Sequence, residues 1–302
     1  METADIFNPS VRTLKMGEVE LTVLEQGGPR IVALKYKGSE NLFASVPQIS
    51  VPTPFGNFHY VGGHRLWHAP EAMPRSYIPD NEGLTISEIP HGIKLIGKTE
   101  PATGMNKQIE ISLQLERPQV KLTHILTNQN LWKIVLANWA ITMFRLGGVA
   151  ILPLQTEVVD REALLPDRKI VLWPYSNMND PRLQLENDFI LLSARQNLPA
   201  FKIGTFNPRG WVAYWNQSVL FQKTFPTFAD VVFPDQGCNA EIYCDEHFIE
   251  LESLAPLVQL EAGSQISYQE EWNLFDSLDQ DFIPREIISL IKNVSESGEP
   301  LE

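Results

Sequence analysis

Basic residues are scarce in this chain of 302 residues. Lysine and arginine number 24 against 37 aspartates and glutamates, which gives a formal net charge of −13 at pH 7. Proteins that bind nucleic acid obtain much of their affinity from basic side chains on the phosphate backbone. The composition therefore argues against nucleic acid as a partner, while 43% hydrophobic and 20% charged residues are typical of a folded globular chain.

Cysteine and long apolar runs are also lacking. Two cysteines, Cys238 and Cys244, are too few for a disulfide framework, so we expect reduced thiols with a packing role. No apolar stretch reaches the roughly 18 to 20 residues of a membrane-spanning helix, and residues 1–10 lack a basic segment followed by an apolar one. We therefore predict a cytoplasmic protein with no membrane partner.

Motifs of nucleotide chemistry are missing as well. The sequence has no P-loop, no strand-linked GxGxxG and no GxSxG elbow. These absences argue against nucleotide hydrolysis, dinucleotide cofactors and α/β-hydrolase chemistry. We expect the protein to work without a cofactor.

The sequence is rich in alternating apolar and polar residues. Residues 105–117 place Ile109 and Ile111 on one face of a strand, and 120–127 continue as the second strand of an antiparallel hairpin. His124 falls on the apolar side of that second strand, which predicts a hydrogen-bonded core histidine. Further strand patterns cover 18–24, 30–37, 92–98, 134–154, 169–173, 183–192, 211–223, 242–254 and 265–275.

The order of these patterns predicts an all-β fold. Strands do not alternate with helices, which argues against a doubly wound sheet and favours large antiparallel sheets packed on each other. We predict a single domain over 1–302 with its core at about 15–275. One helix is expected at 282–294, where Ile287 and Ile291 belong to a broad apolar face.

The segment 62–71 reads Gly-Gly-His-Arg-Leu-Trp-His-Ala-Pro-Glu. Adjacent glycines permit a close backbone approach, and the histidines, arginine and tryptophan put hydrogen-bond donors beside a flat apolar surface. A sugar presents hydroxyl groups to such donors and a C–H face to an indole. We therefore interpret this segment as a loop of a sugar site, with Arg65, Trp67, His68 and Glu71 as contacts.

Two other interpretations of this loop remain open. Trp67 can fill the core of a β-sandwich while Arg65 extends into solvent. His59, His64 and His68 are the alternative as metal ligands, although their spacing fits no compact ligand motif. We therefore predict no metal site.

Two glutamates stand two positions apart near the end of the strand patterns. In a strand, Glu250 and Glu252 share one face while Leu251 occupies the other. Neighbouring carboxyl groups in a cleft raise at least one carboxyl pKa, as a general base near neutral pH requires. On an open face both would simply be solvated, and spacing alone favours that outcome.

A third set of candidates is more scattered. Residues 173–182 form a polar turn with aromatic and charged groups, and a lone lysine at 202 stands between apolar neighbours. Tyr175, Asp180, Arg182 and Lys202 are candidate ligand contacts. A loop ion pair between Asp180 and Arg182, and a lysine that extends from a strand edge, are equally open.

Three segments together resemble the galactose mutarotase-like superfamily. They are GGxRLWxAPE at 62–71, ELESLAP at 250–256 and EAGSQISYQEEW at 261–272. The resemblance extends over about 15–275. It implies a β-supersandwich with a carbohydrate site in a cleft on one sheet.

The resemblance also implies catalytic roles. In aldose 1-epimerases a glutamate in a Leu-Glu-Thr segment is the general base on the anomeric hydroxyl. The sequence at 251–253 reads Leu-Glu-Ser, so Glu252 matches the base, with Glu250 beside it. The acid of those enzymes is a histidine in Asn-His-Ser-Tyr, whereas 138–144 contains no histidine. His64 then becomes the candidate acid.

The expected partner is a small-molecule carbohydrate, and the expected reaction is interconversion of its anomers by glutamate-based acid–base catalysis. The alternative is a non-catalytic sugar-binding or sensor module that has lost the catalytic histidine. An acidic or phosphorylated sugar stays open, because a local field of lysine and arginine can oppose the net charge. The expected substrate contacts are Arg65, Trp67, His68, Glu71, Tyr175, Asp180, Arg182, Lys202 and Glu250.

Overall fold

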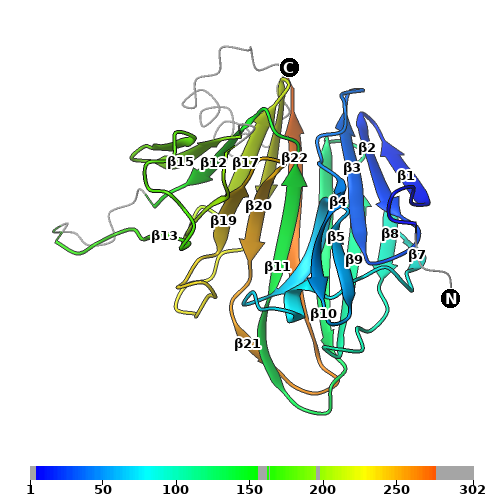
Figure 1. Ribbon diagram of the computed structural model, residues 1–302. Helices are drawn as coiled ribbons and strands as arrows, with labels where there is room; N and C mark the ends of the chain where they lie inside the picture. Colours follow the sequence, from blue (N-terminus) through cyan, green and yellow to red (C-terminus); the bar gives the residue numbers. More distant parts are fainter. Residues whose placement is uncertain (1–4, 156–161, 163, 195–197, 277–302) are drawn as a thin grey trace.

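The computed structural model describes residues 5–155, 162, 164–194 and 198–276 (Figure 1). The predicted helix at 282–294 lies outside these residues. Within them the regular secondary structure is almost all β-strand, and the one helical element is the short 3₁₀ helix η1 (Arg75–Tyr77). This part of the chain contains no helix long and apolar enough to cross a membrane. The predicted all-β class is confirmed.

Ten strands form each of two antiparallel sheets. The first sheet has the order β1 (Val11–Met16), β2 (Val19–Leu24), β3 (Arg30–Tyr36), β6 (Gly63–Ala69), β11 (Ile134–Phe144), β20 (Ile249–Leu254), β19 (Ala240–Cys244), β16 (Phe201–Thr205) and β13 (Ile170–Leu172), with β21 (Val258–Leu260) paired to β11. The second has the order β14 (Leu183–Leu185), β15 (Phe189–Ser193), β12 (Val149–Pro153), β17 (Trp211–Asn216), β18 (Val219–Thr224), β22 (Gln265–Phe275), β10 (Gln119–Asn128), β9 (Met105–Leu113), β8 (Gly92–Ile96) and β7 (Thr85–Ile89). A separate pair consists of β4 (Val46–Thr53) and β5 (Gly56–Tyr60).

The main hydrophobic core lies between the two large sheets. Leu66 of the first sheet and Leu122 and Trp272 of the second belong to it. Cys244 also lies in this core and Cys238 is buried, and the two do not form a disulfide. In Figure 1, β11 of the first sheet runs beside β10 and β22 of the second. Alternate residues of each strand therefore face either the core or the outside of the sandwich.

The predicted hairpin of 105–117 and 120–127 is confirmed as β9 and β10. The two strands pair antiparallel, with Ile111 opposite Leu122 and Ile109 opposite His124. The apolar side chains of both strands are buried against the core, while Glu110 and Thr123 are only partly covered on the other face. Period-two alternation was therefore sufficient to place this pair.

Segment 62–71 is a strand, and its interpretation as a loop is wrong. Gly63–Ala69 forms β6, which pairs with β3 and β11 in the first sheet, and every residue of β6 is buried. Gly62 and Gly63 both have positive φ, and a Cβ on either would lie 1.9 Å from a carbonyl oxygen, of Ala44 and Ile31 respectively. The glycines thus allow the backbone to pass close to its neighbours as the strand begins.

Several segments that show one continuous strand pattern in the sequence contain two strands each. Segment 134–154 contains β11 and β12, which belong to different sheets, because the chain turns between them at Gly147 and Gly148. A Cβ on Gly148 would lie 2.1 Å from the carbonyl oxygen of Trp215, so only glycine fits this position. Three other segments likewise fold into two consecutive strands: 183–192, 211–223 and 242–254.

Candidate functional site

A cleft of about 250 Å³ lies on the outer face of the first sheet. It crosses β6, β11, β20, β19 and β16, whose outward side chains alternate with the side chains that face the core. Aromatic and acidic residues dominate its lining. The lining residues are Tyr60, Arg65, Trp67, Glu71, Tyr77, Trp139, Ile141, Trp173, Tyr175, Ala200, Lys202, Tyr243, Phe248, Glu250 and Glu252.

Aromatic rings build the walls of the cleft. Trp67 and Trp139 are opposite each other on β6 and β11, and their rings meet edge to face with centroids 5.4 Å apart. Phe58 and Tyr77 pack edge to face on Trp67, at 5.4 and 5.1 Å between centroids. Tyr175 is about half exposed, with 49% of its surface accessible. The cleft therefore combines a rigid, buried aromatic base with a more open edge.

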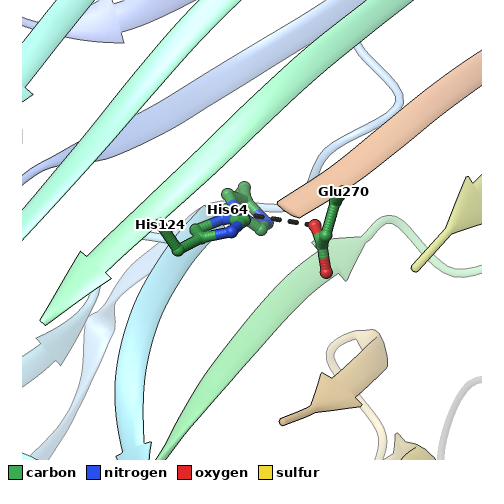
Figure 2. Close-up of side chains that lie close together, drawn as sticks. All are labelled: His64, His124 and Glu270. Carbon is green, nitrogen blue, oxygen red and sulfur yellow. Dashed lines mark hydrogen bonds and ion pairs between the residues drawn. The ribbon is translucent and has the colours of Figure 1, made fainter. Parts of the chain in front are cut away.

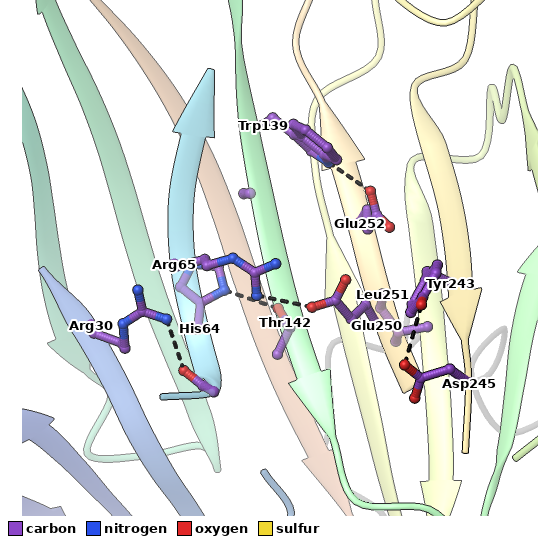
Figure 3. A network of polar contacts seen from close by, with 12 residues as sticks. Arg30, His64, Arg65, Trp139, Thr142, Tyr243, Asp245, Glu250, Leu251 and Glu252 are labelled. Carbon is purple, nitrogen blue, oxygen red and sulfur yellow. Dashed lines mark hydrogen bonds and ion pairs between the residues drawn. The ribbon is translucent and has the colours of Figure 1, made fainter. Parts of the chain in front are cut away.

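Glu252 presents its carboxylate on the face of β20 that lines the cleft (Figure 3). Its Oε2 accepts a hydrogen bond from the indole Nε1 of Trp139 at 2.7 Å and one from Nζ of Lys202 at 2.8 Å. Charge-assisted contacts of this kind fix the position and orientation of a carboxylate. Because both contacts use Oε2, the other oxygen, Oε1, is the one that can accept a ligand's hydroxyl proton.

Lys202 connects two carboxylates beneath the aromatic rings. Its Nζ lies 2.8 Å from Oε2 of Glu241 and 2.8 Å from Oε2 of Glu252. The ammonium also lies 4.9 Å from the ring centroid of Trp139 and 4.6 Å from that of Trp173. Burial lowers the pKa of Lys202, but the two carboxylates outweigh it and hold that pKa well above the ordinary value. Lys202 is therefore a fixed cation.

Arg65 and Glu250 form a second ion pair in the cleft. Nη1 of Arg65 lies 2.9 Å from Oε1 of Glu250, and the guanidinium carbon lies 4.4 Å from the centroid of the Trp67 ring (Figure 3). Burial raises the pKa of Glu250, Arg65 lowers it, and the charge of Glu252 raises it further, with a net increase. Glu250 thus keeps a proton to higher pH than an ordinary glutamate.

The structure brings seven of the eleven predicted site residues into this one cleft. They come from separate parts of the chain. Strands β6 and β20, which lie on either side of β11, supply four of the side chains through the alternation of faces. The seven are Arg65, Trp67, Glu71, Tyr175, Lys202, Glu250 and Glu252. The face shared by Glu250 and Glu252 is therefore the lining of a cleft and not an open surface.

Asp180 and Arg182 do not line the cleft. They pair with each other, with Nη2 of Arg182 2.8 Å from Oδ2 of Asp180, and the arginine side chain is buried. Nη1 of Arg182 also donates to the carbonyl oxygen of Cys244 at 3.4 Å. The pair therefore tethers its loop to β19, which corrects the prediction of a ligand contact and matches the alternative of a loop ion pair.

His64 and His68 do not reach the cleft either. They belong to the same strand as Arg65 and Trp67, but at alternate positions, so their side chains lie on the opposite face together with Leu66. Both histidines are buried, with exposed fractions of 0% and 2%. The geometry therefore separates His64 from Glu252, and the two cannot act as acid and base on one ligand.

Several lining residues were not among the predicted contacts. Trp139 lies in segment 138–144, where the comparison with the epimerase motif concerned only the missing histidine. Trp139 and Ile141 are two residues apart on β11 and therefore share a face of that strand. Because Ile141 lies opposite Glu252 on β20, the same alternation places Trp139 on the outer face of the sheet. Tyr243 and Phe248 belong to no recognisable motif, so only the folded structure shows that they line the cleft.

A second polar cluster is buried between the sheets (Figure 2). Nε2 of His64 and Nε2 of His124 are 2.7 Å apart, and Nδ1 of His64 lies 2.9 Å from Oγ1 of Thr142. Nδ1 of His124 lies 3.2 Å from the carbonyl oxygen of Tyr268, which can only accept, so this nitrogen carries the proton. His64 then donates from Nε2 to His124 and accepts from the threonine hydroxyl. The predicted core role of His124 is confirmed.

His64, His124 and Glu270 also lie close enough together to hold a metal ion, with ligand atoms within 4.8 Å of one another. Two features of the cluster oppose this. The hydrogen-bonded chain already uses Nε2 of both histidines. Nζ of Lys223 lies 3.1 Å from Oε1 of Glu270, and a metal ion would add charge beside that buried ammonium. The donor set therefore fits a neutral hydrogen-bonded chain better than a metal centre.

We expect both buried histidines to be neutral at pH 6.5, where an ordinary histidine is half protonated. Burial lowers the pKa of His64 and of His124, so each gains its proton only below that pH. Ring-nitrogen NMR should find the proton of His64 on Nε2 and that of His124 on Nδ1, with no change on addition of zinc. Protons on Nδ1 of both rings, with Nε2 signals that move when zinc is added, would instead demonstrate a metal site.

Comparison with known proteins finds similarity in structure but not in sequence. No family model matches the chain, and no curated protein is significantly similar to it. A protein of Synechocystis sp. PCC 6803 aligns with a TM-score of 0.56 and 10% identity over 92% of this chain and 99% of that one. A candidate aldose 1-epimerase of Escherichia coli K12 aligns with a TM-score of 0.53 and 11% identity over 89% and 100%. A galactose mutarotase-like protein of Lactobacillus casei ATCC 334 aligns with a TM-score of 0.52 and 11% identity over 88% and 100%.

These alignments cover nearly the full length of both chains in each comparison. The two facing ten-stranded sheets agree with the β-supersandwich that the sequence motifs implied. Such low identity establishes a shared fold and leaves the activity to be argued from the site. The chain shares the fold of these solved structures, which include a galactose mutarotase-like protein.

Proposed function

We propose that the protein binds a monosaccharide in the cleft on the outer face of its first sheet. One observation carries the proposal: the carboxylate of Glu252 is fixed by Trp139 and Lys202 in a cleft with aromatic walls. Such a site offers a carboxylate to sugar hydroxyl groups and flat rings to the C–H face of the sugar. Its volume of about 250 Å³ is below the roughly 300–1,000 Å³ of sites for drug-sized ligands, which favours a single sugar ring.

Replacing Tyr175 with alanine should weaken sugar binding about tenfold, because loss of an aromatic anchor at a binding site costs more than about 1 kcal/mol. The side chain is half exposed and lies at the open edge, so the variant should fold normally. Calorimetry with a panel of hexoses measures the change. The matched control is Trp132→Ala, an exposed aromatic that is not part of the cleft lining and should leave affinity unchanged. Equal affinity of the Tyr175 variant and the wild type would count against this cleft as the binding site.

We further propose that Glu252 acts as general base in the interconversion of sugar anomers. Its Oε1 accepts the proton of the anomeric hydroxyl while the ring oxygen takes a proton from an acid, and the bond between C1 and the ring oxygen breaks. The open-chain aldehyde rotates about C1–C2, and the reverse transfers close the ring as the other anomer. Each carboxyl regains its starting protonation state, so the cycle is balanced.

Glu250 is the proposed proton donor of this reaction. It reacts from its protonated form, in which Arg65 donates a hydrogen bond to a neutral carboxyl group, whereas in the ionised form the two residues are an ion pair. Glu250 lies two residues from Glu252 on the same face of β20, and its pKa is raised by burial, with the charge of Glu252 adding to the increase. A carboxyl group with a raised pKa can act as an acid while its neighbour acts as a base. This assignment replaces His64, whose side chain lies in the core between the sheets.

Sugar binding without catalysis is the second candidate function. It is favoured by a specific observation, because the residues that line the cleft within the described part of the chain include no histidine. Saturable sugar binding with no acceleration of anomer exchange by the wild-type protein would support this candidate over the epimerase.

A further inference from the structure

The cations of the cleft are already matched by carboxylates. Lys202 lies at 2.8 Å from both Glu241 and Glu252, and Arg65 lies at 2.9 Å from Glu250. A ligand that carries a carboxylate or phosphate would have to compete with these buried partners for the same two cations. Breaking a buried pair by removing one partner's counter-charge is costly. The basic residues therefore do not make the cleft a site for anions.

Glu71 adds a negative charge at the rim of the cleft. Its carboxylate accepts a hydrogen bond from the hydroxyl of Tyr77, and the residue is exposed. No lysine, arginine or histidine of the described segments forms an ion pair with it. Glu71 is thus the carboxylate of the cleft that is free to meet a cation brought by a ligand.

Further acidic groups stand behind the lining. Glu241 is buried beside Lys202, and Asp235 lies close enough for its charge to act on Glu241. Burial raises the pKa of Asp235, Lys202 lowers it and Glu252 raises it, with a net increase. Burial is the largest cause, so the raised pKa reflects the covered position of Asp235 first and the charge of its neighbours second. The lining itself contains the carboxyl groups of Glu71, Glu250 and Glu252 against the two cations Arg65 and Lys202, which gives the cleft an acidic balance.

We propose that the cleft binds amino sugars in preference to neutral sugars, and neutral sugars in preference to sugar phosphates and uronates, with the ammonium group of the ligand near Glu71. This inference rests on the proposed sugar-binding function. It follows from two matched cations, one unmatched rim carboxylate and the acidic groups behind them. The sequence allowed an acidic sugar as ligand because of its lysine and arginine residues. In the structure, Lys202 and Arg65 instead hold glutamates in place.

The test compares sugars that differ only in charge. Calorimetry at pH 6.5 and low salt would measure glucose, glucosamine, glucose 6-phosphate and glucuronate, together with the matching galactose series. At that pH an amino group with an ordinary pKa of about 7.7–8.0 is mostly protonated. We expect the amino sugar to bind about two- to fivefold more tightly than its neutral parent, which is the size of one exposed ion pair. We expect the phosphate and the uronate to bind more weakly than the parent.

A variant of the rim carboxylate makes the test specific. In Glu71→Gln the ratio of amino-sugar to parent-sugar affinity should fall to about one, whereas Glu116→Gln, an exposed glutamate outside the cleft lining, should leave the ratio unchanged. Salt should reduce the ratio in the wild type, because the pair is exposed. The inference is overturned if glucose 6-phosphate or glucuronate binds as tightly as glucose, or if Glu71→Gln keeps the preference for the amine. Failure of every sugar to bind would overturn the proposed function itself.

Discussion

Replacing Glu252 with glutamine should slow anomer interconversion by about two to four powers of ten, the usual contribution of a positioned acid or base. The amide keeps the size of the side chain and can still accept from Trp139 and Lys202 through its oxygen, but it cannot take the anomeric proton. NMR exchange spectroscopy measures the rate at which the two anomers of a sugar that the protein binds interconvert. A rate in this variant equal to that of the wild type would eliminate Glu252 as the base.

A binding measurement on the same variant separates catalysis from affinity. Sugar affinity should fall much less than the exchange rate, because the aromatic walls and the pair of Arg65 with Glu250 remain. Glu88→Gln is the matched control, since this exposed glutamate belongs to β7 of the other sheet. It should change neither rate nor affinity.

Replacing Lys223 with alanine should reduce the free energy of unfolding by about 3–5 kcal/mol, a large part of the 5–15 kcal/mol that is typical of a domain. Nζ of Lys223 lies 3.1 Å from Oε1 of Glu270, and both side chains have an exposed fraction of 0%. The same ammonium donates to the carbonyl oxygens of Ala140 at 3.0 Å and Leu251 at 3.2 Å. The variant would leave the carboxyl group of Glu270 buried without its cation.

Urea unfolding measures this loss, and two further variants show its cause. Lys121→Ala breaks a pair with Glu271 whose side chains are about half exposed, so its cost should stay below about 1 kcal/mol. Replacing both members of the buried pair, as Lys223→Met with Glu270→Gln, should recover much of the stability because no charge is then left unpaired. A cost of less than 1 kcal/mol for Lys223→Ala would show that this buried pair does not stabilise the fold.

Alternation along a strand correctly predicted that Glu250 and Glu252 share a face, although spacing alone favoured a solvated one. Glu250 and Glu252 share a face because successive side chains of any strand point to opposite sides, whatever the tertiary contacts are. Leu251 accordingly lies in the core and both glutamates line the cleft. The sequence could not show that Lys202 and Arg65 hold them, since those contacts join strands far apart along the chain.

The same alternation explains the main error at the site. Segment 62–71 was interpreted as a loop, in which neighbouring side chains can converge on one ligand. As strand β6 it sends Arg65 and Trp67 to the cleft and His64 and His68 to the interior. The glycine pair that suggested a loop is required by the close approach of Ala44 and Ile31, which are distant in sequence and invisible to a local pattern.

The most direct test of sugar binding at this cleft is a crystal structure of the protein with a bound hexose. We expect a sugar ring packed on the aromatic wall that includes Trp67, with a hydroxyl group within hydrogen-bond distance of Oε1 of Glu252. A hexose bound elsewhere, such as in the groove on the second sheet that includes Pro226 and Gln269, with this cleft free of sugar, would contradict it.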